Sequence, residues 1–252
     1  MLPQKVDILG CEVDALRLDE ATRRVIGLVE RRGVAHATVV NAAKLVRMRD
    51  DDMLRKLVRD ADLVTADGAA VVYAARWLGE KLPGRTTGCD LMQRLLEIAP
   101  NRGWRVYFLG ATPTVLSDVV RACGERYPGI TFAGFRDGYF DIDNAESIAT
   151  AIRDAQPDLL FIGMGTPRQE RFLSEWRDTM QVPFSMGVGG SFDVVSGLKD
   201  RAPRWMRDNG LEWAHRLAID PRHMWRRAIV DSARFAVHVN RAKYRGYRLP
   251  EP

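Results

Sequence analysis

The sequence lacks three features that would assign it quickly to a class of protein. It has three cysteines, Cys11, Cys89 and Cys123, an odd number without metal-ligand spacing, which favours a reducing compartment over a disulfide framework. No stretch approaches the roughly 18 consecutive apolar residues of a membrane-spanning helix. The first residues contain no apolar core of a signal peptide. We therefore expect a cytoplasmic protein.

The sequence also has little excess charge outside its last 54 residues. Residues 199–252 carry a net charge of +7, whereas the whole chain carries +5, so the first 198 residues carry −2. A near-neutral body with a basic end is not the pattern of a general nucleic-acid-binding protein. It indicates that one end of the molecule meets an anionic surface. We therefore expect a core, residues 1–198, followed by a C-terminal appendage, residues 199–252.

What the sequence does contain is a repeated pattern of apolar strand, glycine turn and helix. In Asp158–Phe172, the apolar run Leu159–Ile162 is followed by glycines, including Gly165, and then by a helix start. Gly110 and Gly189 follow two other expected strands. The pattern predicts an α/β fold with a Rossmann-like, mainly parallel sheet and helices on both faces. Ligands bind at the carboxyl ends of such strands, so these three glycines are candidate substrate-binding residues.

Several nucleotide-binding motifs are absent. The stretch after Leu159–Ile162 has Arg168 where the dinucleotide fingerprint has its third glycine, and no Walker A sequence is present. A NAD-dependent oxidoreductase and a P-loop hydrolase are therefore disfavoured. Asp141-Ile-Asp143 has the letters of the D-x-D metal motif of many sugar transferases. Because Asp143 lies just before an expected helix, we interpret it as a helix cap.

The C-terminal region predicts a basic amphipathic helix. Basic residues recur every seven positions at Arg227, Arg234, Arg241 and Arg248. Apolar residues fall on another stripe at Trp225, Ile229, Ala236 and Val239. Such a segment, with Trp205 and Trp213 before it, is typical of a helix that lies on anionic lipid. The alternative is a helix packed on the domain with a solvated basic face.

Six sequence motifs occur in order along nearly the whole chain. They are Asn41-Ala-Ala-Lys, Ala66-Asp-Gly, Gly84-Arg-Thr-Thr-Gly-Cys-Asp-Leu, Gly163-Met-Gly-Thr-Pro-Arg-Gln-Glu, Met186-Gly-Val-Gly-Gly-Ser-Phe-Asp, and Arg201-Ala-Pro with Gly210-Leu-Glu-Trp. With these motifs the chain resembles the WecG/TagA/CpsF family of bacterial glycosyltransferases. The resemblance implies an inverting, metal-independent transfer, without a cofactor, from a UDP-sugar to a sugar on a polyprenyl diphosphate in cell-surface polysaccharide or glycolipid synthesis. It also implies that the C-terminal appendage docks on the anionic inner face of the plasma membrane.

The resemblance assigns roles to individual residues. Asp67 matches the family's proposed catalytic base, which would take a proton from the acceptor hydroxyl. Arg85 matches an arginine that would bind a diphosphate and stabilise the charge on the departing UDP. Other residues are implied to bind substrate: Asn41, Thr38, Gln169, Asp193, Arg216, Arg222 and Arg226. Thr38 is included because Val39 stands where the family often has a threonine.

The residues alone also allow other interpretations. Asp67 could cap the helix that follows it, Arg85 could be a solvated loop arginine, and Gln169 could be a surface residue. A different function, a nucleotide-sugar-binding regulatory module recruited to the membrane, would have no use for Asp67 and Arg85 together. The sequence does not indicate the donor sugar, the acceptor sugar, the linkage or the oligomeric state.

Overall fold

The computed structural model describes residues 4–219, 221–225 and 230–245. By its contacts the chain divides into two compact units. Unit 1 comprises Met1–Arg17, Val39–Thr87 and Arg201–Pro252, and unit 2 comprises Leu18–Thr38 and Gly88–Asp200. The residues from 201 onward therefore group with residues 39–87 rather than forming a unit of their own. The expected boundary between residues 198 and 199 stays a prediction.

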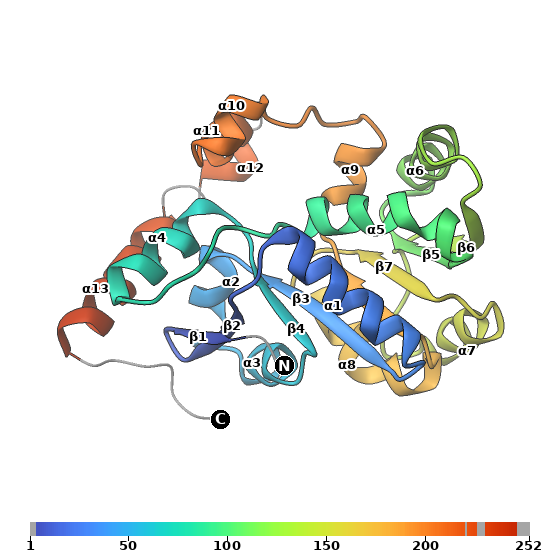
Figure 1. The fold of residues 1–252 in the computed structure, drawn as a ribbon, viewed down its shortest axis with the longest axis horizontal. Helices are drawn as coiled ribbons and strands as arrows, with labels where there is room; N and C mark the ends of the chain where they lie inside the picture. Colours follow the sequence, from blue (N-terminus) through green and yellow to red (C-terminus); the bar gives the residue numbers. More distant parts are fainter. Residues whose placement is uncertain (1–3, 220, 226–229, 246–252) are drawn as a thin grey trace. The chain divides into compact units, whose positions relative to one another are not determined.

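The strands form a six-stranded sheet in the order β4-β3-β8-β7-β5-β6 (Figure 1). Their bounds are β3 (Ala35–Val40), β4 (Leu63–Ala66), β5 (Arg105–Gly110), β6 (Thr131–Arg136), β7 (Leu159–Gly163) and β8 (Phe184–Gly187). The pairs β3–β8, β8–β7, β7–β5 and β5–β6 are all parallel. Leu159–Ile162 is completely buried, as an apolar run inside a covered parallel sheet requires. The predicted α/β class and mainly parallel sheet are confirmed.

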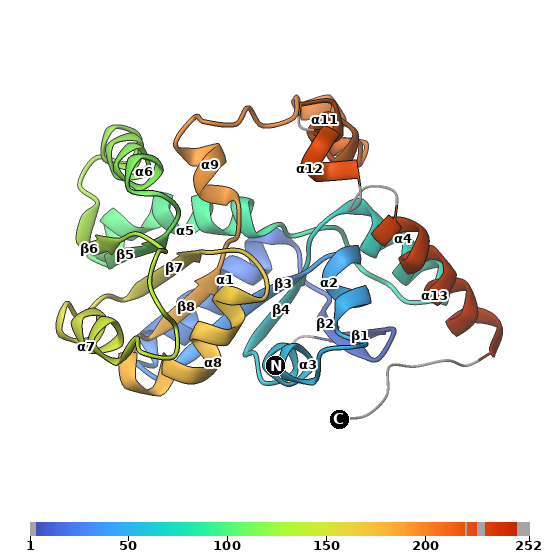
Figure 2. The same cartoon turned by 180° about the vertical axis from the view of Figure 1, so that it is seen from behind.

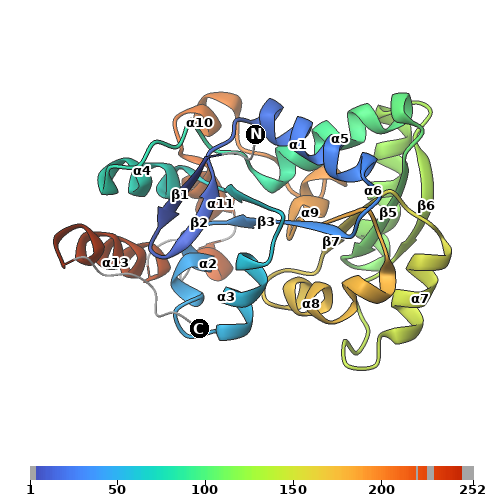
Figure 3. The ribbon, with the colours of Figure 1, turned by 60° about the horizontal axis from the view of Figure 1, so that its bottom comes forward.

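In unit 2, helices cover both faces of the strands. These helices are α1 (Leu18–Glu30), α5 (Gly88–Arg102), α6 (Pro113–Arg126), α7 (Glu146–Asp154), α8 (Arg168–Met180) and α9 (Ser191–Val195). Figure 3 shows α1 and α5 on one side of β5 and β7, and α7 and α8 on the other. Phe108 lies at the centre of this core, with ring centroids 6.1 Å from Phe161 and 5.5 Å from Phe192. The unit is thus held by apolar packing across the sheet.

The interpretation of Asp143 as a helix cap is wrong. Helix α7 begins at Glu146, and the residue before it, Ala145, caps it without a side-chain hydrogen bond. The Asp143 carboxylate instead forms an ion pair with Arg171. Asp141 accepts a hydrogen bond from the Asp143 backbone N–H at 3.1 Å. The two aspartates therefore order an exposed turn.

Unit 1 contains a hairpin and seven helices among the residues described for it. The elements are β1 (Lys5–Ile8), β2 (Cys11–Asp14), α2 (Ala42–Arg47), α3 (Asp52–Arg59), α4 (Ala69–Leu78), α10 (Arg204–Asp208), α11 (Glu212–Ile219), α12 (Pro221–Trp225) and α13 (Ser232–Arg245). Strands β1 and β2 pair antiparallel to form the hairpin, and Asp14 ties it to β4 by accepting a hydrogen bond from the Val64 N–H at 2.7 Å. Burial raises the pKa of the Cys11 thiol to about 12, so it stays protonated.

Helix α13 is a packed helix in its described part. Phe235 and Val239 are only 5% and 6% exposed and belong to the apolar core that also contains Val71 and Ala75 of α4. Figures 1 and 2 both show α13 beside α4, and α13 contacts α2 and α4. The predicted apolar stripe is wrong at Ala236, which is exposed. The apolar face runs instead through Phe235, Val239 and Ala242, at the i, i+4, i+7 spacing of one helix face.

The described part of the C-terminal region contains several separate helices, and not one continuous basic helix. Arg234 and Arg241 are exposed on α13, whereas Arg227, Ile229 and Arg248 lie outside the described residues. Helices α10, α11 and α12 precede α13 and carry three large exposed side chains, Trp205, Trp213 and Trp225. Within the described residues, none of the helices combines the length and the apolar character needed to cross a bilayer. Membrane docking stays a prediction.

Because α13 completes the core of unit 1, we expect Phe235→Ala to lower the free energy of unfolding by about 3–5 kcal/mol. The exposed Tyr244 on the same helix gives a matched control, and Tyr244→Ala should change it by less than about 0.5 kcal/mol. Urea denaturation followed by circular dichroism measures both changes. Equal stability of the two variants would show that α13 is not part of the core.

Deleting residues from 199 onward also exposes this core. A loss of membrane binding in such a deletion variant could therefore result from unfolding, so the deletion does not by itself test membrane docking.

Candidate active site

A cavity of about 450 Å³ in unit 1 brings together three of the predicted site residues, Asn41, Asp67 and Arg85. Its lining residues are Asn41, Ala42, Ala43, Asp67, Gly68, Ala69, Ala70, Tyr73, Arg85, Gly210, Glu212, Trp213 and Ser232. Asn41 stands at the end of β3, where its side-chain oxygen accepts a hydrogen bond from the Lys44 N–H at 2.9 Å and caps α2. Its side-chain NH₂ group is the part left to donate to a ligand.

Asp67 follows β4 and is not the cap of the next helix. Its backbone N–H donates to the Val40 carbonyl at 2.8 Å, which fixes it at the ends of β3 and β4. The N-cap of α4 is Gly68, which has φ +101° and supplies no side-chain hydrogen bond. The structure therefore rules against the capping role for Asp67 and places this residue in the lining of the cavity.

Arg85 is held in the cavity by an ion pair. Its Nη1 lies 3.2 Å from Oε2 of Glu212, and the two side chains are only 20% and 17% exposed. The next residue, Thr86, anchors the loop, because its N–H donates to the Ala66 carbonyl and its hydroxyl donates to the Leu16 carbonyl. Arg85 is therefore not the solvated loop arginine that the residues alone allowed.

The turn before α11 sits directly against the start of α4. Gly210 has φ +73°, and a Cβ built on it would lie 2.5 Å from the Cβ of Ala69. Only glycine permits both this backbone conformation and this close approach. The turn thereby delivers Glu212 to Arg85. The motif Gly210-Leu-Glu-Trp contains both residues, but nothing in the sequence assigns a role to Glu212.

A second cavity, of about 590 Å³, lies in unit 2 at the ends of β5 and β7. It is lined by Ala111, Gly138, Tyr139, Phe140, Gly163, Met164 and Arg168. A Cβ on Gly110 would lie 2.5 Å from the Gly163 backbone oxygen, so the two strand ends approach closely because residue 110 is glycine. Arg168 donates to the carbonyl oxygens of Gly138 and Phe140 and lies over the Phe140 ring. The guanidinium thus holds the loop that forms one wall.

Gln169 is a buried residue and not the surface residue that the sequence alone allowed. It is 3% exposed, its Nε2 donates to Glu170 at 3.0 Å, and its Oε1 accepts from the Gly189 N–H at 3.1 Å. A Cβ on Gly187 would lie 2.5 Å from its Nε2. Gln169 therefore shapes the turn that contains Gly189. Gly165 lies in the turn just before α8 and has φ +72°. Its carbonyl oxygen accepts a hydrogen bond from the Gln169 N–H.

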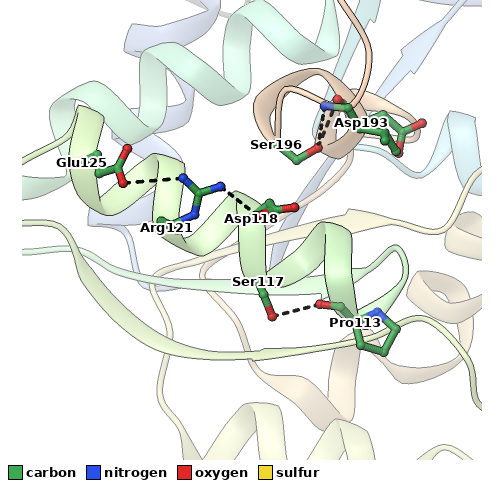
Figure 4. Close-up of polar contacts among 8 residues, drawn as sticks. Pro113, Ser117, Asp118, Arg121, Glu125, Asp193 and Ser196 are labelled. Carbon is green, nitrogen blue, oxygen red and sulfur yellow. Dashed lines mark hydrogen bonds and ion pairs between the residues drawn. The ribbon is translucent and has the colours of Figure 1, made fainter.

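Asp193 lies on α9, as Figure 4 shows, where its backbone carbonyl accepts a hydrogen bond from the Ser196 hydroxyl at 3.1 Å. Its carboxylate accepts from Lys199 Nζ at 2.7 Å. On α6, which contacts α9, Arg121 pairs with Asp118. The Lys199 contact restrains the Asp193 side chain, whereas the Arg121–Asp118 pair lies within α6.

The structure places none of the remaining predicted residues that it describes in the lining of these two cavities. Thr38 is 4% exposed inside β3 and is not in the lining of either cavity. Arg222 is exposed on α12. Arg216 lies on α11 but its side chain is outside the described structure, and Arg226 is outside the described residues altogether. Among the residues that the structure describes, no group of three or more His, Cys, Asp or Glu side chains could hold a metal ion.

Comparison with known proteins identifies the family. The profile of the glycosyl transferase WecG/TagA/CpsF family matches residues 6–249. The chain belongs to this family. It is 33% identical over 200 residues to the N-acetylglucosaminyldiphosphoundecaprenol N-acetyl-beta-D-mannosaminyltransferase of Bacillus subtilis strain 168, covering 79% of this chain and 77% of that protein. It is also 33% identical over 225 residues to the Staphylococcus aureus strain NCTC 8325 protein of the same name, covering 88% and 86%. The resemblance seen in the motifs is confirmed, and the protein is a glycosyltransferase.

Proposed function

We propose that the protein transfers a sugar, with inversion and without a metal ion, from a UDP-sugar to a sugar carried on a polyprenyl diphosphate. The observation that carries this proposal is the unit 1 cavity, in which an aspartate that does not cap its helix and a partly buried arginine line the same space. The names of the two relatives specify a diphosphoundecaprenol-linked acceptor. That acceptor class is what we propose for this chain.

In the proposed reaction, Asp67 acts as the general base. Its carboxylate takes the proton of an acceptor hydroxyl as the oxygen attacks the anomeric carbon of the donor sugar. The new carbon–oxygen bond forms while the bond from the anomeric carbon to the diphosphate breaks, and the electron pair leaves with UDP. A single displacement of this kind inverts the anomeric configuration.

Arg85 is proposed to compensate the negative charge that grows on the leaving diphosphate. A guanidinium can donate to two oxygens of a phosphate at once, and it keeps its charge at any working pH. The ion pair with Glu212 restrains the Arg85 side chain, and both residues line the cavity. Glu212 is thus a positioning residue in this proposal.

The other predicted residues keep their proposed roles as substrate contacts. Gly110, Gly165 and Gly189 form turns at strand ends, the usual ligand edge of a parallel sheet. Gln169 is proposed to contact a sugar or phosphate oxygen, and its hydrogen bond with the Gly189 N–H holds its side chain in place. For the appendage, exposed tryptophans on α10, α11 and α12 support docking on the anionic inner face of the membrane, with Arg216, Arg222 and Arg226 near phosphate groups.

A screen of UDP-sugars against a sugar-diphosphate acceptor, read by mass spectrometry, tests the function. We expect one donor to give a product heavier than the acceptor by one sugar, equally in EDTA and in Mg²⁺. The anomeric coupling in the NMR spectrum of the product should show inversion. Binding of a nucleotide sugar without any product would favour the regulatory module, and activity restored by Mg²⁺ or Mn²⁺ after EDTA would contradict the metal-independent mechanism.

A further inference from the structure

The outward face of α4 carries an apolar stripe that begins in the unit 1 cavity. Ala70, Tyr73 and Trp77 follow the i, i+3, i+7 spacing that places residues on one helix face. Tyr73 and Trp77 are 60% and 51% exposed, although large aromatic side chains are usually buried. The opposite face of α4, through Val71, Ala74 and Ala75, is buried in the core. The stripe is therefore not needed to hold the helix in place.

The stripe is continuous with the cavity at one end and leads away from it at the other. Ala69, Ala70 and Tyr73 line the cavity together with Asp67, whereas Trp77 does not. The helix rise places Trp77 about 12 Å beyond Ala69 along the axis. A long molecule whose polar end is at Asp67 and whose other end is hydrocarbon would thus meet a polar cavity first and aromatic side chains next.

We propose that this stripe binds the first isoprene units of the lipid-linked acceptor. The inference rests on the proposed function, because it takes the acceptor to be a sugar diphosphate on a polyprenyl chain. Sugar and diphosphate are polar and suit the cavity, and the branched hydrocarbon that follows suits the faces of Tyr73 and Trp77. Water would otherwise contact both the aromatic rings and the first part of the chain as it leaves the bilayer.

The test compares two water-soluble acceptors without vesicles or detergent: the same sugar diphosphate carrying a methyl group or a farnesyl group, kept below its micelle concentration. The quantity measured is the ratio of kcat/KM for the farnesyl acceptor to kcat/KM for the methyl acceptor. In the unaltered protein we expect a ratio of about 10 or more, because burying several hydrocarbon groups favours the longer acceptor.

Trp77→Gln should bring this ratio down by about fivefold or more, whereas Trp77→Phe should keep most of it because an aromatic face remains. Tyr244→Gln is the matched control, since Tyr244 is an exposed aromatic residue of unit 1 outside the cavity lining, and it should keep the unaltered ratio. Circular dichroism spectra verify that the variants are folded.

The outcomes separate this inference from the proposed function. If neither acceptor gives a product with the unaltered protein, the proposed function fails. If both acceptors react and the ratio is near one, or is the same in Trp77→Gln, the inference alone is overturned. A variant that loses activity only on vesicles, with its ratio in solution unchanged, would assign Trp77 to the bilayer surface and would also contradict the inference.

Discussion

Asp67→Asn should reduce the turnover number of sugar transfer by about 10²- to 10⁴-fold, the usual contribution of a positioned general base. Asparagine has nearly the same shape but cannot accept the proton of the acceptor hydroxyl at working pH. The fold should be unchanged, because Gly68 and not Asp67 is the N-cap of α4, and the backbone N–H of Asp67 keeps its hydrogen bond to the Val40 carbonyl in the variant. Affinity for the UDP-sugar should also remain. Initial rates and calorimetric titration measure the two quantities.

The control for this variant is Asp62→Asn. Asp62 is an exposed aspartate just before β4, whereas Asp67 is just after it, so the two substitutions bracket the same strand. Turnover within about twofold of the unaltered protein is expected for Asp62→Asn. If Asp67→Asn retained comparable turnover, Asp67 would not be the base.

Arg85→Ala should lower kcat/KM by about 10²- to 10³-fold, similar to the loss of one preorganised donor to a developing negative charge. It should also weaken the binding of UDP, because the diphosphate would lose a bidentate partner. Arg85→Lys keeps the charge but not the planar fork, so we expect it to recover only part of the activity. Steady-state kinetics and titration with UDP measure both effects.

Two further variants distinguish the role of Arg85 from the loss of any arginine and from the loss of its ion pair. Arg59→Ala removes an exposed arginine of unit 1 from α3 and should leave UDP affinity and rate as they are. Glu212→Gln should reduce kcat/KM less than Arg85→Ala does, because the arginine keeps its charge and loses only the partner that positions it. If Arg85→Ala had the UDP affinity and the rate of the unaltered protein, Arg85 would not bind the diphosphate as proposed.

The fold was largely predictable because its signals are local. Apolar runs such as Leu159–Ile162 predict buried strands, and the glycines after them predict the turns, as the structure shows for β7. The start of α7 was not predicted, because aspartates before a helix serve turns as readily as caps. For Asp143 the contact that decides is with Arg171, 28 positions away.

The candidate site was predictable only in part. The motifs singled out Asn41, Asp67 and Arg85, and the structure brings these three to one cavity. The sequence could not show that Glu212 pairs with Arg85, because that contact joins residues 127 positions apart. The contact of Gln169 with substrate stays a prediction, and the sequence could not show that its side chain is buried and accepts a hydrogen bond from the Gly189 N–H. The packing of Phe235 was not predicted, because the expected apolar stripe passed through Ala236 and not through Phe235.

The most direct test of the central claim is a single-turnover experiment with enzyme in excess over a sugar-diphosphate acceptor, using the UDP-sugar that the donor screen identifies. Mass spectrometry follows the conversion of acceptor to product in the presence of EDTA for the unaltered protein, Asp67→Asn and Asp62→Asn. We expect rapid gain of one sugar mass with the unaltered protein and with Asp62→Asn, and conversion at least about a hundredfold slower with Asp67→Asn. Conversion by Asp67→Asn at the unaltered rate would show that Asp67 is not the general base of the transfer.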